Sequence, residues 1–125
     1  MKNYILTREK IDKILRRLAF EIAERNAGEK QLLLAGIKEN GLVIAQKLQQ
    51  LLTEIFKGQI EVMYIDVDDK RYPRKITLSD IRNFDDAVVI VVDDVANSGK
   101  TILYALKPLL EYLPKKIQTM ALVER

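Results

Sequence analysis

The spacing of hydrophobic residues along the chain predicts three helices. Between residues 7 and 26, hydrophobic side chains recur every three or four positions and charged side chains lie between them, which is typical of an amphipathic helix. The same spacing predicts a second helix over residues 41–57, which Gly58 ends, and a third over residues 98–112, in which Pro108 marks a kink or a restart. The hydrophobic positions of the first helix are Ile11, Ile14, Leu15, Leu18 and Ile22.

Four shorter apolar segments predict strands at residues 31–37, 60–67, 86–93 and 116–123. The segment AVVIVV has no polar position, which is typical of a strand that is covered on both faces of a parallel sheet. The segment at 68–86, DDKRYPRKITLSDIRNFDD, is charged, contains Pro73 and has no period, so we expect a long loop there.

Helices and strands therefore alternate along a single domain that spans residues 1–125. This order predicts an α/β fold: an open, mostly parallel twisted sheet with helices on both faces. Ligands of such sheets bind beyond the carboxyl ends of the strands. Two loops are expected at that edge: GIKENG at residues 36–41 and DDVANSGKT at residues 93–101.

Composition narrows the chemistry that these loops can perform. The chain has neither cysteine nor histidine, which excludes disulfides, thiol catalysis, the usual zinc sites and Ser-His or Cys-His mechanisms. No stretch has the length of a membrane span and no signal peptide opens the chain, so a cytoplasmic location without membrane partners is expected. A net charge of +3 suits an anionic ligand but is too small to indicate nucleic acid by itself.

The loop DDVANSGKT ends like the P-loop of a nucleotide-binding protein, in Gly99, Lys100 and Thr101. The P-loop pattern, however, requires a glycine where Asp94 stands. A carboxylate facing a phosphate at about 4 Å would cost roughly 4 kcal/mol at an effective dielectric constant near 20. No Walker B strand follows either, so the sequence argues against an ATPase.

A ligand with two different ends fits this loop better. Adjacent carboxylates at Asp93 and Asp94 can accept hydrogen bonds from vicinal hydroxyls, and the small residues that follow, with a helix N-terminus, suit a phosphate monoester. A diol and a phosphate on one small molecule describe a ribose 5-phosphate. The simpler alternative, a polar strand end with a helix cap, accounts for only one of these residues.

The 14 residues VVIVVDDVANSGKT resemble the phosphoribosyl pyrophosphate (PRPP) signature of the type I phosphoribosyltransferases. The resemblance implies transfer of the ribose 5-phosphate of PRPP to a nucleobase with release of pyrophosphate. It implies that Asp93 and Asp94 hold the ribose hydroxyls. The remaining PRPP-binding residues on this side would be Val95 and the 5-phosphate loop Ala96, Asn97, Ser98, Gly99, Lys100 and Thr101.

The loop GIKENG resembles the pyrophosphate loop of the same family, which often carries a non-proline cis peptide. Gly36 and Ile37 would offer backbone groups to PRPP, Lys38 would add a cation, and Gly41 opens the next helix. Taken alone, the same pattern also suits a tight strand-to-helix connection.

The resemblance also implies a mobile flap and a metal ion. The basic residues Lys70, Arg71, Arg74 and Lys75 lie where the family keeps a flap over the pyrophosphate, although a solvated surface loop is an equal alternative. Mg²⁺ would bridge the diol and the pyrophosphate, with Asp93 and Asp94 holding it indirectly through ribose hydroxyls or water. The expected catalytic residues are Asp93, Asp94, Lys38 and Arg71.

Within the family, the segments AGIKENG and VDDVANSGKT are most similar to pyrimidine-operon attenuators that are also uracil phosphoribosyltransferases, so uracil is the expected base. Asn97 stands where enzymes for 6-oxopurines carry a titratable Asp, which argues against those bases. The sequence ends at Arg125, before a segment that covers the base in those relatives, so transfer to uracil is expected to be very slow or absent.

Two expectations concern partners. A PRPP- or nucleotide-sensing regulator that binds RNA is the alternative to an enzyme, but acidic residues interleave the basic ones of the first helix, a pattern more typical of a solvated face. We also expect a homodimer, because a small open sheet with an amphipathic outer helix leaves apolar surface to cover.

Overall fold

The computed structural model describes residues 7–68, 75–96 and 99–124. Its elements, in chain order, are α1 (Arg8–Arg25), β1 (Gln31–Ile37), α2 (Asn40–Ile55), β2 (Gln59–Val67), β3 (Ile76–Leu78), β4 (Val88–Ala96), α3 (Lys100–Ala105), the 3-10 helix η1 (Lys107–Glu111) and β5 (Lys116–Glu124). None of the helices in this described part is long and apolar enough to cross a membrane.

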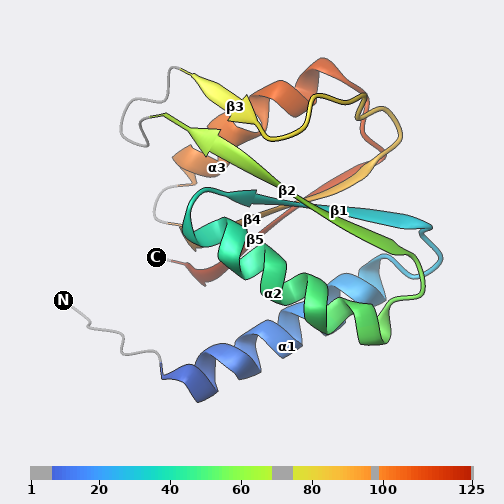
Figure 1. Cartoon of the computed structure of the whole chain (residues 1–125), viewed down its shortest axis with the longest axis vertical. Coiled ribbons are helices and arrows are strands. Elements are labelled where there is room, and N and C mark those ends of the chain that lie inside the picture. Colours follow the sequence, from blue (N-terminus) through green and yellow to red (C-terminus); the bar gives the residue numbers. More distant parts are fainter. Residues whose placement is uncertain (1–6, 69–74, 97–98, 125) are drawn as a thin grey trace.

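The five strands form one sheet in the order β3-β2-β1-β4-β5. All neighbouring pairs are parallel except β2 and β3. Helices α1 and α2 cover one face of this sheet, and α3 with η1 covers the other (Figure 1). The expected α/β fold, with a mostly parallel sheet between two helical layers, is confirmed.

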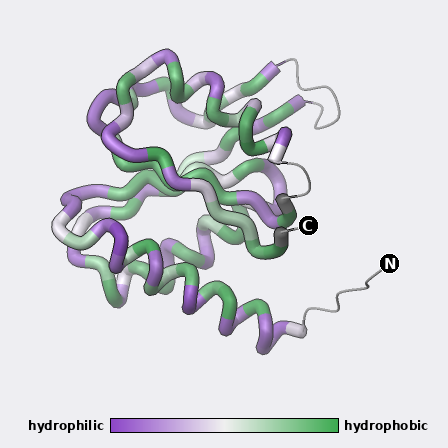
Figure 2. Tube along the Cα trace, turned by 180° about the vertical axis from the view of Figure 1, so that it is seen from behind, coloured by the Kyte–Doolittle hydropathy of each residue, from purple (hydrophilic) through white to green (hydrophobic). Residues whose placement is uncertain are grey.

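The core has two halves because the sheet is buried on both faces. Along β4, Val88, Ile90 and Val92 pack with residues of α1 and α2, whereas Val89 and Val91 pack with residues of α3 and η1. All five are at most 5% exposed. Figure 2 shows the same arrangement, with hydrophobic residues concentrated in the strands and polar residues interspersed along the outer helices. The apolar run in the sequence therefore did predict a strand that is covered twice.

Two expectations about local structure were wrong. The expected loop at 68–86 contains the short antiparallel edge strand β3, in which Val67 pairs with Ile76 and Ile65 pairs with Leu78. The expected single helix at 98–112 is two elements, because α3 ends at Ala105 and η1 begins at Lys107 with Pro108 in its first turn. The proline has no N–H to continue the α-helical pattern, so the predicted restart is correct but the continuous helix is not.

The third predicted strand also has different bounds. It was expected at 86–93, whereas β4 starts two residues later and continues to Ala96. Both acidic residues of the signature therefore belong to the strand itself. Their backbone is held by pairing with β5, where Asp93 lies opposite Ala121, and this pairing fixes the direction in which the loop begins.

Candidate functional site

The sheet contains a topological switch point between β1 and β4. From β1 the chain crosses through α2 to β2 on one side, and from β4 it crosses through α3 and η1 to β5 on the other side. The loops that leave the two strands diverge there, which opens the position where open α/β sheets bind ligands. The loops GIKENG and DDVANSGKT both start at this position, so the structure brings the two candidate segments together (Figure 1).

Two glycines allow the start of α2 to approach the sheet closely. A Cβ atom on Gly41 would lie 2.4 Å from the carbonyl oxygen of Val92, and one on Gly36 would lie 2.5 Å from Cα of Leu42. Real Cβ atoms do not tolerate such distances. Both glycines are therefore required for packing the first turn of α2 against the ends of β1 and β4.

Gly36 and Ile37 lie deeper than the sequence suggested. Gly36 pairs with Tyr64 and with Val92 in the middle of the sheet, and the side chain of Ile37 is fully buried. The strand ends at Ile37, as expected, and the N–H of Lys38 donates to the carbonyl of Ile65 at 2.9 Å. Contacts of Gly36 and Ile37 with a ligand can therefore involve their backbone only.

The two acidic residues of the signature differ in exposure. Asp93 is only 3% exposed, and its Oδ1 accepts the N–H of Asp94 at 2.9 Å. Asp94 is half-buried. The sequence shows two equivalent carboxylates, whereas the structure presents Asp94 to the solvent and places Asp93 behind it.

Asp94 is also the residue that connects the two loops. The side-chain amide of Asn40, the first residue of α2, donates from Nδ2 to Oδ2 of Asp94 at 2.9 Å. The pKa of the Asp94 carboxyl lies below its usual value. The largest single effect, burial, raises this pKa. Four hydrogen bonds together lower the pKa by more than burial raises it: those with the side chains of Asn40 and Asp93 and those with the backbone N–H groups of Val95 and Asp94.

Lys38 is positioned by an aromatic ring. Its Nζ lies 4.6 Å from the centre of the Tyr64 ring, a cation–π contact. The peptide bond between Lys38 and Glu39 is cis, as the resemblance of this loop led us to expect. Beside it lies a hollow of about 440 Å³ that is lined by Lys38, Glu39, Asn40, Asp66, Val67 and Asp68.

Part of the expected phosphate loop is described. Gly99 has φ of +76°, a left-handed conformation that glycine adopts without strain, and it precedes the first residue of α3. Lys100 is exposed and Thr101 is half-buried. Ala96 ends β4, while Asn97 and Ser98 lie outside the described residues. Because α3 has only six residues, its dipole is weaker than the longer predicted helix would supply.

The expected flap lies largely outside the described residues, since Lys70, Arg71 and Arg74 belong to the range 69–74. Lys75 directly precedes β3, and its N–H donates to Oδ1 of Asp68 at 3.1 Å. For Mg²⁺, the oxygen ligands that the ion prefers are present as carboxylates of Asp93 and Asp94. Within residues 7–68, 75–96 and 99–124 there is no group of three or more acidic side chains that could hold a metal directly.

Sequence reasoning missed two residues of this site, Asn40 and Tyr64. Asn40 directly precedes Gly41 at the start of a predicted helix, which was a usable signal that it lies near the ligand edge. Tyr64 occupies an ordinary strand position, so nothing in the sequence marked it as the partner of Lys38.

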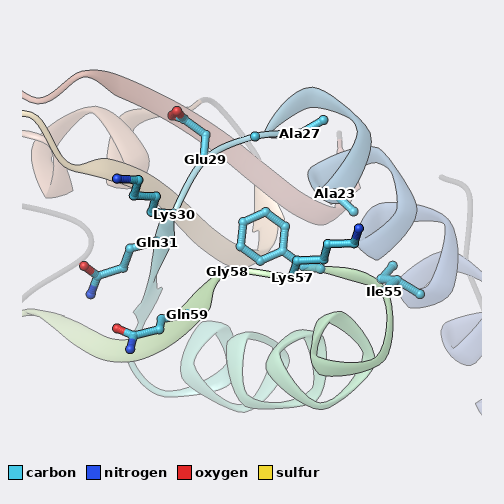
Figure 3. A pocket seen from close by; sticks show the side chains of 11 residues that line it. Ala23, Ala27, Glu29, Lys30, Gln31, Ile55, Lys57, Gly58 and Gln59 are labelled. Carbon is cyan, nitrogen blue, oxygen red and sulfur yellow. The ribbon is translucent and has the colours of Figure 1, made fainter.

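A larger hollow than the one beside Lys38 lies at the opposite edge of the sheet. It has a volume of about 790 Å³ and lies between the ends of α1 and α2, with Ala23 and Ala27 on one side and Ile55 on the other (Figure 3). Lys30 and Lys57 extend at its rim. A second hollow of about 570 Å³ shares Gly28 to Gln31 with it and extends to the Glu29–Lys115 ion pair. Neither contains a predicted site residue, so we place the site by its chemistry rather than by the size of the hollow.

Comparisons with known proteins identify the family of the chain. The model of the phosphoribosyl transferase domain matches residues 3–125. The Bifunctional protein PyrR of Staphylococcus saprophyticus is 32% identical over 97% of this chain and 74% of its own length, and that of Staphylococcus aureus strain JH9 is 36% identical over 92% of this chain and 71% of its own length.

Solved structures show the same fold. A purine phosphoribosyltransferase from Pyrococcus horikoshii is 25% identical, with a TM-score of 0.77 over 99% of this chain and 78% of that one. A hypoxanthine-guanine phosphoribosyltransferase from Bacillus anthracis is 20% identical, with a TM-score of 0.78 over 100% of this chain and 72% of that one. The expected resemblance to the pyrimidine-operon type is confirmed, and the chain belongs to the phosphoribosyltransferase domain family, whose enzymes are pentosyl-transferring glycosyltransferases.

Proposed function

We propose that this phosphoribosyltransferase takes the ribose 5-phosphate of PRPP and transfers it to uracil. The bond between the anomeric carbon and a pyrophosphate oxygen breaks, a bond from that carbon to a ring nitrogen of uracil forms, and the proton of that nitrogen is released. The observation that carries the proposal is the position of Asp94 at the switch point, beside the first turn of α2.

Each half of PRPP has a matching part of the site. Asp94, assisted by Asp93, would accept hydrogen bonds from the ribose hydroxyls, and the loop that ends in Gly99, Lys100 and Thr101 would hold the 5-phosphate. The first turn of α2 would receive the pyrophosphate. Its cap residue, Glu39, makes no side-chain hydrogen bond to that turn, so the N–H groups of the turn are not capped by this residue. Lys38 lies beside that turn and would add a positive charge.

These residues need not supply a nucleophile, because the reaction passes through an oxocarbenium-like transition state in which the leaving group departs early. These residues would bind PRPP, orient it for attack by the base and exclude water. A chain that lacks histidine and cysteine can do this. Mg²⁺ would neutralise the charge that develops on the leaving pyrophosphate. Arg71 and the other flap cations, together with Lys38, would contribute in the same direction.

Uracil is the proposed base for two reasons. The curated relatives are of the PyrR type, and Asn97 cannot titrate as the acid of 6-oxopurine enzymes does. The similarity to purine enzymes of known structure concerns the fold, since the one from Bacillus anthracis is only 20% identical.

A second function, binding of RNA as a regulator that responds to PRPP or nucleotides, is favoured by one observation. The relatives carry the name "Bifunctional protein", which indicates more than one activity in those proteins.

A homodimer also remains part of the proposal. It is supported by large apolar side chains at the surface, among them Phe20 on α1 at 61% exposure and Leu103 and Leu110 at 65% each. The absence of cysteine agrees with a cytoplasmic location.

A steady-state assay with PRPP, Mg²⁺ and uracil tests the main proposal. We expect formation of uridine 5-phosphate and pyrophosphate in equal amounts, loss of activity when Mg²⁺ is chelated, and no product with hypoxanthine. Product with hypoxanthine but not with uracil would overturn the choice of base. If PRPP with Mg²⁺ fails to bind in calorimetry, the assignment of the site itself is wrong. Salt-dependent binding of RNA by the same preparation would support the second function.

A further inference from the structure

A hydrogen bond joins the two halves of the proposed PRPP site. Asn40 is the first residue of α2, the helix whose N-terminal turn would receive pyrophosphate, and Asp94 is the half-buried acid that would receive the ribose hydroxyls. Nδ2 of Asn40 and Oδ2 of Asp94 are 2.9 Å apart, although the residues are 54 positions apart in the sequence. The contact therefore crosses the switch point between the two loops.

The surroundings hold both partners in place. Gly41, the neighbour of Asn40, lies so close to Val92 that a Cβ atom would be 2.4 Å from the Val92 carbonyl oxygen. Asp94 follows Val92 by two residues in β4, and its carboxylate accepts backbone hydrogen bonds as well as that of Asn40. A shift of the first turn of α2 must therefore move the Asp94 carboxylate, and a shift of that carboxylate must move the first turn of α2.

We infer that Asn40 is a positioning residue that couples the pyrophosphate half of the PRPP site to the ribose half through Asp94. Its amide fixes the orientation of the carboxylate, so that pyrophosphate bound at the start of α2 leaves Asp94 set for the ribose hydroxyls. Because coupling between two ligands is reciprocal, ribose 5-phosphate likewise favours pyrophosphate. The inference rests on the proposed function, since it assigns the two halves of the ligand as that function does.

A purely structural role for Asn40 has different consequences. The side chain of Asn40 does not cap α2, because the cap position is Glu39, and the bond to Asp94 is exposed to solvent. Exposed hydrogen bonds contribute little to the stability of a fold. Loss of the amide is therefore expected to alter ligand coupling while the melting temperature stays nearly the same.

The test uses the two halves of PRPP, pyrophosphate and ribose 5-phosphate, as separate probes. Calorimetry measures the affinity for pyrophosphate with Mg²⁺, for ribose 5-phosphate, and for each in the presence of the other. In the natural chain we expect each probe to strengthen binding of the other about tenfold, within the usual range of coupling between sites. In Asn40→Ala we expect this factor to fall close to one, and in Asn40→Asp we expect it to fall below one, because two carboxylates then face each other across the gap.

Two controls separate the explanations. Gln46→Ala removes an exposed amide from the same helix and should leave the coupling unchanged. Asn40→Ala introduced into the Asp94→Asn variant should cause no further loss of coupling, because Asn40 acts through the Asp94 carboxylate. In the transfer assay, Asn40→Ala should lower kcat more than it raises KM for PRPP.

The outcomes distinguish failure of the inference from failure of the proposed function. If neither probe binds to the natural chain, the proposed PRPP site is wrong. If both probes bind and their coupling is the same in Asn40→Ala as in the natural chain, the role of Asn40 is wrong while the site stands. A further loss of coupling on adding Asn40→Ala to Asp94→Asn would also overturn the inference, because Asn40 would then act by another route.

Discussion

The two edges of the sheet differ in the polar side chains that lie beside their hollows. At the carboxyl edge, a modest hollow adjoins Asn40, and the nearby Asp94 has its pKa lowered by directed hydrogen bonds. At the amino edge, larger hollows adjoin an ion pair between Glu29 and Lys115, whose charged atoms are 2.6 Å apart. The ion pair at the amino edge joins the segment before β1 to the segment before β5, whereas polar groups at the carboxyl edge converge on a place for a ligand. The convergence of polar groups, and not the volume of a hollow, therefore distinguishes the candidate site.

The largest expected effect comes from removing one charged side chain at each edge of the sheet and comparing the affinities for PRPP. Asp94→Ala should weaken binding of PRPP with Mg²⁺ roughly 100-fold, because it removes charge-assisted hydrogen bonds to the ribose hydroxyls. Lys57→Ala, at the rim of the 790 Å³ hollow, should leave the affinity unchanged. Isothermal titration of both variants provides the measurement. If Lys57→Ala weakened PRPP as strongly as Asp94→Ala, the ligand would belong at the amino edge.

A matched pair of glycines sharpens the same comparison. A Cβ atom on Gly41 would lie 2.4 Å from the Val92 oxygen, and one on Gly58 would lie 2.6 Å from the Lys30 oxygen. Replacement of either by Ala should cost about 1–3 kcal/mol of unfolding free energy through overpacking. Only Gly41→Ala should also weaken PRPP binding, about tenfold, because it displaces the start of α2. Urea unfolding and calorimetry check both effects, and equal affinities of the two variants would contradict the prediction.

A second glycine pair tests backbone conformation without crowding. Gly99 at the carboxyl edge and Gly28 at the amino edge have φ of +76° and +88°. Among the described residues, chain neighbours aside, neither has an atom within 4 Å of a Cβ position. Replacement by Ala should therefore cost roughly 1–2 kcal/mol in each case, from the left-handed backbone alone. Gly99→Ala should in addition reduce affinity for ribose 5-phosphate several-fold, and Gly28→Ala should not. Unaltered ribose 5-phosphate binding in Gly99→Ala would remove this loop from the phosphate site.

The smallest effect concerns the ion pair of the amino edge. The hydrogen bond from Lys115 lowers the pKa of Glu29 below its usual 4.5, and the same bond raises the pKa of Lys115 above 10.5. The stabilisation from Glu29 is therefore fully present above pH 4.5 and is lost as the pH falls through the lowered pKa. Glu29→Gln should melt slightly below the natural chain at pH 7, and the two melting curves should converge in acid. PRPP binding should be the same in both. A difference in melting temperature that persisted at a pH below the lowered pKa of Glu29 would point to packing rather than charge.

Much of the fold was predictable because its signals are local. The run from Val88 to Val92 identifies a doubly covered strand without knowledge of its neighbours, and the spacing in α1 identifies its buried stripe. The strand β3 was not predictable in the same way. Its three residues are too few for a period, and they form a strand because β2 offers them a pairing edge, which is a property of the folded sheet.

The sequence predicted which residues form the candidate site but not how they are arranged. The signature placed Asp93 and Asp94 at the end of a strand, and they are there. The burial of Asp93, by contrast, depends on the register between β4 and its neighbours. The contact of Asn40 with Asp94 depends on how closely α2 approaches β4, which the glycines permit but do not specify by themselves.

The sequence separation between Asn40 and Asp94 has a consequence for folding. The strands β1 and β4 are adjacent, yet the whole excursion through α2, β2 and β3 lies between them in the chain. Pairing of such distant segments is slow and belongs to the cooperative part of folding, so partly folded chains that lack it have no PRPP site. Ligand then binds only the native state, and a concentration 100 times the dissociation constant stabilises it by about 2.7 kcal/mol. In a cell, the supply of PRPP would thereby set how long the chain resists unfolding and degradation.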